Sequence, residues 1–402
     1  MSRQPIALAA LVLLASLAPM AAASGATPPQ ASSNSDVEAY SGSHVSFGTD
    51  SSALVGYAVE GETVLSSVEV QSESQVQSDL GLGVSGDLET VTDFAGAGLS
   101  MDASAQASAN VQVESGATIS AHDHSHGTLV VDAEDDQYVS LGLNASSEAQ
   151  ADSDSRVLVT TDSGTKAAVM VVGDGDVAVN DDGNVTANVK AESKLVVRSY
   201  SEERTESDEQ TEQLIANGTA AAEVYVDQQN GERVNGTITY DQDTDVTVDA
   251  ESENAVNMTI DRAQSQGKVV IASASQFAAE STDDLTVRVD GDVAAQASSY
   301  SELRAAADNG ATSKYMVKHS ASAQADADVL VAVNHFSERS VSIADADSSS
   351  DGGDGSDTNG DDTTNDDTDN GSTGSGDGPG FGVVAALLSM FGLASLLARH
   401  GR

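Results

Sequence analysis

The chain has 402 residues, of which 64 are acidic and 17 are basic, and its formal net charge at pH 7 is −47. Nucleic acid and anionic lipid headgroups are excluded as favoured partners, because binding them depends on exposed Lys and Arg. The complete lack of cysteine excludes disulfides, thiol catalysis and a lipid-modified N-terminal cysteine.

The acidic residues are confined to the stretch between two terminal apolar segments. That stretch holds all 64 of them but only 14 of the 17 basic residues, so it carries a charge of about −50. In ordinary salt this charge would repel itself and weaken a compact state, whereas at molar salt the Debye length is only about 3 Å. A disordered acidic chain is the alternative, but Val-rich patterned stretches disfavour it. We therefore expect the secreted domain of a halophile.

The first 23 residues have the pattern of a secretory signal peptide. Arg3 provides a basic start, residues 6–18 form an apolar core, and the alanines at 21–23 form a small-residue cleavage site. Gln4 follows Arg3, so the twin-arginine pair is absent and we expect a Sec-type route with cleavage by signal peptidase. Residues 24–36, rich in Pro, Ser and Thr, are predicted to be a flexible leader.

Residues 37–344 are predicted to form a mainly β ectodomain. Short runs of Val, Leu and Ile are separated by Asp, Gly, Asn and Ser, which is the pattern of many short strands joined by turns. The clearest runs are residues 68–70, 129–131, 157–159, 177–179, 195–197, 224–226, 269–271, 287–289 and 329–331. We expect a sandwich-like or solenoid-like fold of one or two units, whose boundary the pattern does not locate.

Further segments alternate apolar and polar residues and stop at Asp, which predicts strands with one buried face. These segments are 238–241, 246–249 and 258–261. Helix signals are fewer. Residues 201–215 are rich in Glu and Gln and predict either an exposed helix or a mobile loop, whereas residues 299–307 predict a short helix. Residues 94–110 fit neither period.

The segment His122-Asp123-His124-Ser125-His126 gathers three of the seven histidines. Imidazole suits Zn, Cu or Ni, so His122, His124 and His126 are the candidate metal ligands. On a straight strand the outer two would lie roughly 13 Å apart and could not share an ion, whereas neighbours could do so if the segment bends. The alternative, which we favour from the sequence, is a solvated polar loop before the strand at 129–131.

Other chemistry is weakly marked. The Asp clusters at 241–245 and 174–176 have the oxygen density of a calcium loop, but the first lacks the Gly and the distal Glu of an EF-hand. Gly-x-Ser-x-Gly, His-Glu-x-x-His and the P-loop are absent, and no Gly-x-Gly-x-x-Gly stands at a strand–helix junction. We therefore expect neither an enzyme nor a cofactor. The isolated histidines His44, His319 and His335 leave open a hydrolase whose site is assembled in space.

Six Asn-x-Ser/Thr sequons mark candidate N-glycosylation sites in a secreted chain. Their asparagines are Asn144, Asn184, Asn217, Asn235, Asn257 and Asn370.

The C-terminal part combines a polar spacer with one apolar segment. Residues 345–378 consist almost wholly of Asp, Gly, Ser, Thr and Asn, so we expect a disordered spacer. Pro379, Gly380 and Phe381 follow, and the apolar run that begins at Phe381 extends to residue 398 before a basic end. Eighteen helical residues span about 27 Å, close to the thickness of a bilayer core.

Together these features resemble the PGF-CTERM sorting signal of haloarchaeal surface proteins. The resemblance covers only residues 345–402 and rests on Pro379, Gly380 and Phe381 with the spacer, helix and basic end around them. It implies that an archaeosortase cuts near the tripeptide and replaces the helix with a lipid. The protein would then be anchored in the membrane by the helix before cleavage or by the lipid after it. It implies nothing about the ectodomain.

The sequence thus predicts a secreted, membrane-tethered and glycosylated surface protein with a structural or interaction role in a haloarchaeal envelope. Other surface-layer proteins are its candidate partners. Two alternatives stay open. One is a surface module that binds a metal or small ligand, with His122, His124 and His126 as the concrete candidates. The other is an extracellular hydrolase built around His44, His319 or His335.

Overall fold

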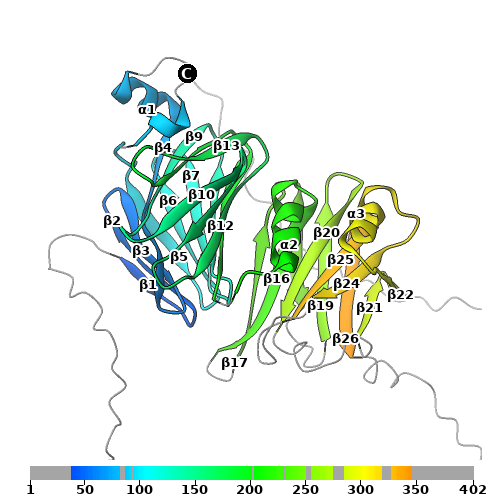
Figure 1. Ribbon diagram of the computed structural model, residues 1–402. Helices are drawn as coiled ribbons and strands as arrows, with labels where there is room; N and C mark the ends of the chain where they lie inside the picture. The colour runs from blue at the N-terminus through cyan, green and yellow to red at the C-terminus, as the bar shows by residue number, and fades with distance from the viewer. Residues whose placement is uncertain are drawn as a thin grey trace, which may run out of the picture. The chain divides into compact units, whose positions relative to one another are not determined.

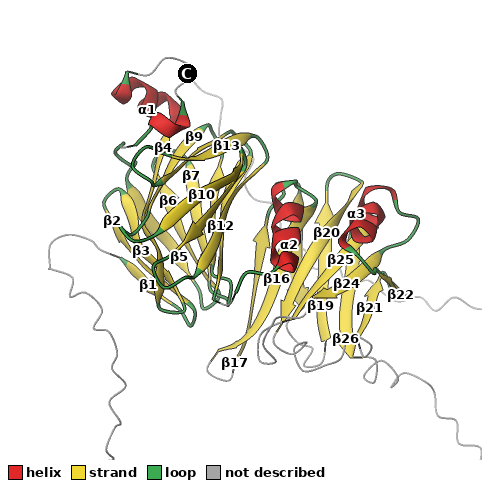
Figure 2. Ribbon diagram, in the orientation of Figure 1, coloured by secondary structure: helices red, strands yellow, loops and turns green. Residues whose placement is uncertain are grey.

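The computed structural model describes residues 38–81, 87–92, 94–201, 203–229, 232–249, 255–274, 285–318 and 327–345. The predicted signal peptide, leader and sorting signal, and the predicted spacer apart from Asp345, lie outside these residues and stay predictions; Asp345 is the last residue of a strand rather than part of a spacer. Strands make up most of the described chain, as Figure 2 shows, so the mainly β fold class is confirmed.

Sheets A and B face each other across a shared core (Figure 1). Sheet A is ordered β1 (Ala39–Ser41), β2 (Val45–Asp50), β3 (Ala53–Val59), β4 (Glu62–Ser72), β9 (Gln137–Gly142), β14 (Val185–Val189) and β13 (Gly175–Val179). Sheet B is ordered β10 (Glu148–Ser153), β11 (Arg156–Thr160), β12 (Lys166–Val172), β15 (Ser193–Tyr200), β8 (Thr128–Ala133), β7 (Ala117–His122), β6 (Ser108–Val113) and β5 (Leu99–Ser104). Alternate residues such as Val70, Leu141 and Val169 fill the core, which makes this part an antiparallel sandwich.

Sheets C and D form a second sandwich with its own core. Sheet C is ordered β17 (Glu232–Thr239), β16 (Ala220–Gln229), β20 (Gln266–Ala274), β25 (Ala327–His335), β24 (Lys314–Lys318) and β23 (Ala295–Gln296). Sheet D is ordered β18 (Thr244–Asp249), β19 (Ala255–Arg262), β26 (Arg339–Asp345), β21 (Leu285–Val289) and β22 (Asp292–Val293). Among the described strands, only the pairs β16–β20 and β23–β24 are parallel.

A third apolar cluster joins the outer face of sheet B to the outer face of sheet C, and we call this region the B–C interface. Sheet B contributes Ala168 and sheet C contributes Ile271, while Leu214 comes from helix α2 (Glu206–Ala216), which contacts both β12 and β16. Helix α3 (Tyr300–Asn309) lies over β20 and β25 (Figure 1). The two sandwiches therefore meet through packed side chains.

The strand predictions agree closely with the structure. All nine apolar runs lie within strands, and the alternating segments 246–249 and 258–261 lie in β18 and β19. Segment 238–241 runs off the end of β17. The sequence did not predict β5 or the start of β6 within 94–110, because the small Ala and Ser side chains there give a weak period. It also did not predict the short helices α1 (Glu73–Leu80) and η1 (Leu88–Thr90).

The segment 201–215 contains a helix, but the helix is neither exposed nor a mobile loop. Thr205 caps α2 through a capping box with Asp208, which fixes its start at Glu206. The helix buries Glu212 and Leu214. Counting apolar residues underestimated the buried face, because part of that face consists of acidic side chains that pair with cations. The second predicted helix is confirmed as α3, capped by Ser299.

Candidate functional site

The histidine segment lies inside the B–C interface rather than in solvent. His122 is the last residue of β7, and residues 123–127 turn the chain into β8. His122 and His124 are 8% and 2% exposed, Asp123 is fully buried, and His126 is half-buried. The expectation of a solvated polar loop is therefore wrong. The segment is buried by residues of β16, which lies far along the chain. A contact with such a distant strand cannot be predicted from the local sequence.

Aromatic contacts hold the three rings between the sheets. His124 stacks on Tyr225 of β16, with ring centroids 4.6 Å apart and planes 19° apart. His122 meets the same tyrosine edge-on at 6.1 Å. His126 meets Tyr200 of β15 edge-on at 5.7 Å. The segment is thus packed against both sandwiches.

The histidines do not converge as a ligand set. Across the described ranges, no group of three or more His, Asp or Glu side chains is arranged to hold a metal ion. The Nε2 atom of His124 lies 3.0 Å from Thr128 Oγ1, and the Nδ1 atom of His122 lies 3.4 Å from the Tyr225 hydroxyl. The metal role of His122, His124 and His126 stays a prediction that this geometry does not favour.

Asp123 clamps the loop before β2 onto the interface. Its carboxylate accepts backbone N–H groups from Ser43, His44 and Val45 at 2.7, 2.8 and 2.7 Å. A Cβ atom on Gly42 would lie 2.2 Å from this carboxylate, so only glycine allows the approach. The carboxylate also accepts the side-chain amide of Gln229 from β16 at 3.2 Å. Both sandwiches therefore bind one buried carboxylate.

The environment keeps the three imidazoles neutral. Burial lowers the pKa of His122 to about 4, even though Glu223 favours its charged form. Burial, reinforced by Arg198, lowers the pKa of His126 to about 3 and that of His124 well below its usual value. At neutral pH the segment thus adds no charge to the interface.

A buried ion pair crosses the interface beside the histidines. The Arg198 Nη1 atom of β15 donates to Glu223 Oε2 of β16, and neither side chain is more than 1% exposed. The Tyr240 hydroxyl donates to the same oxygen at 2.7 Å. Among the residues that the structure describes, the Nε and Nη2 atoms of Arg198 find no hydrogen-bond partner, and neither does Glu223 Oε1. The pair therefore tolerates little disturbance, because the loss of one member leaves a bare charge.

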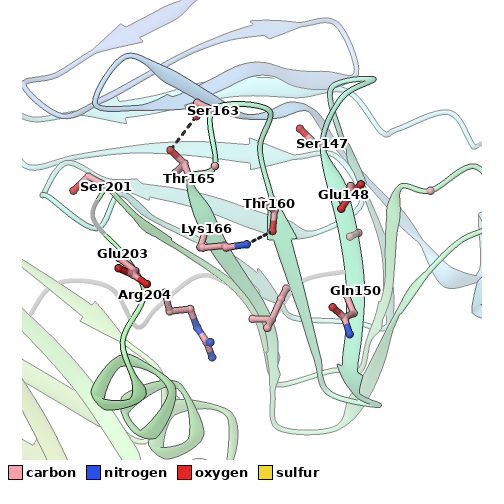
Figure 3. A pocket seen from close by; sticks show the side chains of 14 residues that line it. Ser147, Glu148, Gln150, Thr160, Ser163, Thr165, Lys166, Ser201, Glu203 and Arg204 are labelled. Atoms are coloured by element: carbon pink, nitrogen blue, oxygen red, sulfur yellow. Dashed lines mark hydrogen bonds between the residues drawn. The ribbon is translucent and has the colours of Figure 1, made fainter.

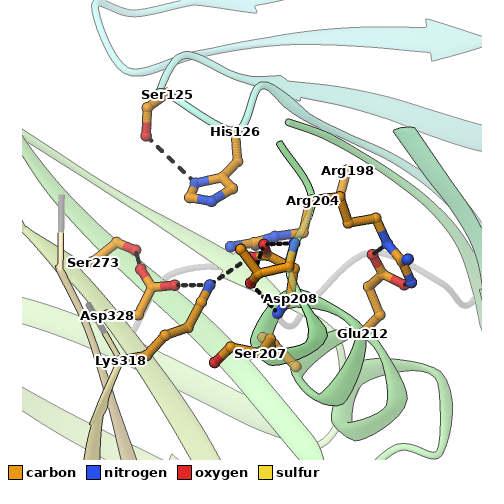
Figure 4. A network of polar contacts seen from close by, with 12 residues as sticks. Ser125, His126, Arg198, Arg204, Ser207, Asp208, Glu212, Ser273, Lys318 and Asp328 are labelled. Atoms are coloured by element: carbon orange, nitrogen blue, oxygen red, sulfur yellow. Dashed lines mark hydrogen bonds and ion pairs between the residues drawn. The ribbon is translucent and has the colours of Figure 1, made fainter. Parts of the chain in front are cut away.

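A second buried cluster surrounds Lys318 of β24 (Figure 4). Its Nζ atom lies 2.6 Å from Asp208 Oδ1 of α2 and 2.9 Å from Asp328 Oδ2 of β25, and Ser273 donates to the second carboxylate. Burial alone would raise the pKa of the Asp328 carboxyl, but Lys318 together with His126 and Arg198 holds it well below its usual range. The cluster ties the start of α2 to sheet C.

A third cluster ties the same helix to sheet B. Glu212 is fully buried, and its carboxylate accepts hydrogen bonds from the Nε and Nη2 atoms of Arg204 at 2.6 Å each. Arg156 of β11 donates to it at 3.2 Å. Five of the chain's few cations thus lie at or beside the interface, namely Arg156, Lys194, Arg198, Arg204 and Lys318. Because the stretch between the terminal segments carries about −50, placing cations between the sandwiches offsets the repulsion between the two sandwiches.

His44 is an ion-pair residue rather than part of a catalytic triad. Its Nδ1 atom lies 2.5 Å from Glu60 Oε1 in sheet A's β3–β4 turn, and its Nε2 atom lies 2.8 Å from Asp227 Oδ2 in β16. The hydrogen bond to Asp227 raises the pKa of His44 to about 9 against the opposing effect of burial. Both ring nitrogens bind carboxylates, so neither can activate a serine. His335 is exposed at the end of β25, and His319 lies outside the described residues.

An open groove of about 1080 Å³ lies over β10, β11 and β12 and beside Ser201, Glu203 and Arg204 (Figure 3). It is lined mainly by hydroxyl, amide and charged side chains: Ser147, Glu148, Gln150, Thr160, Ser163, Thr165, Lys166, Ser201, Glu203 and Arg204. The Lys166 Nζ atom donates to Thr160 Oγ1 at 2.7 Å. The groove has the size of a small-molecule site but lacks the apolar and aromatic lining typical of one.

The acidic cluster at 241–245 is used within the fold. Asp241 Oδ2 accepts from Arg262 at 2.8 Å and lies 3.3 Å from the Lys268 Nζ atom, while Asp241 Oδ1 accepts the Asp243 N–H. A carboxylate already neutralised in this way is a poor calcium ligand.

The sequons differ in exposure. Asn217 is exposed at the C-cap of α2. The others that the structure describes are half-buried, and they are Asn144 and Asn184 in loops, Asn235 in β17 and Asn257 in β19. Asn370 and the sorting residues Pro379, Gly380 and Phe381 lie outside the described residues.

Sequence reasoning missed the charged core of the interface. One signal was present: Arg198 directly follows Leu195-Val196-Val197, and Glu223 lies between Ala222 and Val224. A lone charge inside an apolar strand must be paired or exposed, so such positions mark buried ion pairs on the covered faces.

Neither a protein-family model nor a curated protein sequence matches the chain. Within the described ranges, no helix combines the length and the apolar character needed to cross a bilayer.

Proposed function

We propose that this protein is a non-enzymatic structural or interaction component of a haloarchaeal cell envelope. The observation that carries the proposal is that many of its ionisable side chains are engaged in ion pairs inside the fold. His44 and several buried carboxylates and cations pair with one another between the two sandwiches, where they join the halves of the ectodomain. Groups consumed in this way are not free for catalysis, whereas a joined pair of sandwiches suits a load-bearing or presenting role.

The location is proposed from the sequence. A signal peptide at 1–23, an acidic spacer at 345–378 and the PGF-type signal at 379–402 support export and C-terminal tethering. Signal peptidase and an archaeosortase are the processing partners that the resemblance implies. A strongly acidic ectodomain supports life in molar salt and disfavours nucleic acid as a partner.

Surface proteolysis and mass spectrometry of native membranes test this proposal. We expect protease added to intact cells to release ectodomain peptides, and we expect replacement of Pro379, Gly380 and Phe381 by alanine to leave peptides of 381–398 in the membrane form. A cytoplasmic chain that intact cells protect from protease would refute the proposal. Recovery of 381–398 from the wild-type membrane form would refute the processing step alone.

A surface binding module is the second candidate, and the groove over β10–β12 is the observation that favours it. Its polar lining suits a hydroxyl-rich ligand such as a sugar. A glycan array probed with the full chain and with a Gln150→Ala, Lys166→Ala variant tests it. Binding that the variant loses would support this candidate, whereas equal signals from both proteins would remove the groove from consideration.

A further inference from the structure

We propose that the B–C interface is an acid-sensitive joint, in which protonation of His122, His124 and His126 separates the outer faces of sheets B and C while each sandwich stays folded. The geometry places all three imidazoles at the contact between the sandwiches. Two of them pack on Tyr225 of sheet C, and the third packs on Tyr200 of sheet B. A charge on any ring would therefore arise within the joint itself.

The groups that face His126 and His124 already balance one another. His126 faces Arg198 of β15, Lys318 of β24 and Asp328 of β25. Asp328 is paired with Lys318, so it is not free to pair with a new cation. His124 faces the same Arg198 and Asp328, together with His122 and the charged His44.

His122 has the most favourable surroundings for a proton, and these are still insufficient. It faces Glu223 of β16, Lys194 of β15 and the Tyr225 hydroxyl. Glu223 is paired with Arg198. Burial outweighs the attraction of this carboxylate, and it lowers the pKa of His122 to about 4.

The sign of the effect follows from linkage. A histidine exposed by opening has an ordinary pKa near 6.5, whereas in the closed joint the pKa is lowered to about 4 for His122 and about 3 for His126. The open form therefore binds more protons. The joint has its full stability above about pH 6.5 and loses it as the pH falls, by up to about tenfold in the opening constant per pH unit for each histidine.

Each sandwich should stay folded when the joint opens, because each has its own apolar core. The A–B core and the C–D core consist of separate sets of apolar residues that contain no histidine. The third apolar cluster, which opening would expose, is a set of residues separate from both cores. Protonation thus adds charge to the joint and leaves the two cores unchanged.

The lack of native cysteine allows a direct test with matched probes. Ala168 and Ala167 are neighbours on β12 and are both fully buried, but Ala168 faces the B–C interface and Ala167 faces the A–B core. Each is replaced by cysteine in the full chain in molar KCl. Reaction with 4,4′-dithiodipyridine, which labels thiols in mild acid, is followed from pH 7 to 5 and corrected for the rate with a free thiol.

We expect Ala168→Cys to react about tenfold faster or more for each pH unit below 6, while Ala167→Cys stays protected. In the Ala168→Cys background, a His122→Gln, His124→Phe, His126→Phe variant should lose most of this acceleration, and His126→Phe alone should lose part of it. The exposed His335→Gln should change nothing.

Three results would overturn the proposal. The two cysteines could become reactive together, which indicates global unfolding. Neither could react down to pH 5. The His126→Phe variant, which requires only one ring exchange, could show the same acceleration as the parent.

Discussion

Arg198 of β15 and Glu223 of β16 form an ion pair between two sandwiches in which the side chains are 1% and 0% exposed. Tyr240 adds a hydrogen bond to the same carboxylate oxygen. A pair buried this deeply contributes little net stability compared with apolar residues, but the loss of one member is costly. We therefore expect the pair to fix the register of the two sandwiches more than it strengthens their contact.

We expect Glu223→Ala to lower the free energy of unfolding by about 3–5 kcal/mol, because Arg198 is left charged and buried. The double variant Arg198→Met, Glu223→Leu should restore most of that loss. Urea unfolding in molar KCl measures both. The control is Arg339→Ala, which breaks the more exposed pair with Asp290 and should cost less than about 1 kcal/mol. Equal losses for Glu223→Ala and Arg339→Ala would contradict the prediction.

Asp123→Ala should destabilise the protein by about 3 kcal/mol, because three backbone N–H groups at 43–45 lose a charged acceptor. Asp123→Asn should cost less, since it keeps one acceptor oxygen. Hydrogen exchange at Ser43, His44 and Val45 reports the effect locally. Asp50→Ala is the matched control, because Asp50 accepts one backbone N–H, from Ser51, in an exposed turn. Unchanged exchange in Asp123→Ala would argue against the clamp.

His44 should make stability depend on pH in the alkaline range. Its pKa is raised to about 9 in the folded protein, so its contribution is fully present below about pH 6.5 and is lost as the pH rises through 9. We expect the urea midpoint of the wild type to fall between pH 7 and 10, and the His44→Gln variant to show a flatter profile. Parallel profiles for the two proteins would exclude the ion pairs with Glu60 and Asp227 as the cause.

Salt should be required for the folded state. Because the chain between the terminal signals carries about −50, we expect unfolding when KCl is lowered from molar concentration to about 0.1 M, where repulsion is less screened. Circular dichroism across a dialysis series measures this. The uncharged osmolyte sucrose at low salt serves as the control, since it stabilises compact states without screening charge. A β spectrum that persists at low salt without osmolyte would contradict the halophilic interpretation.

Much of the fold could be predicted because strand patterns are local. Val246 and Val248 alternate with polar residues within six positions, and this is enough to define β18. The candidate site could not be predicted in the same way. Asp123 is buried by residues 43–45 and by Gln229, which is 106 positions away along the chain. A polar segment covered by distant strands has the same sequence pattern as a solvated loop.

The interface was hidden for a related reason. In β12 both Ala167 and Ala168 are buried, one on each face of sheet B, so the strand is apolar on both sides. That pattern predicts a strand buried on both faces, but it does not predict which elements bury the second face. The covering elements, α2 and sheet C, follow later in the chain, and α2 hides its own buried face among acidic residues such as Glu212.

Asp208 has two roles that bear on the order of folding. It completes the capping box that starts α2, and it binds Lys318, which is 110 residues further along the chain. During synthesis, which starts at the N-terminus, the first sandwich could form long before β24 has been made. Asp208 would then still lack its partner Lys318. We therefore expect the first sandwich to assemble early, and the docking of the start of α2 onto sheet C to wait for the last strands, as a slow step set by loop closure.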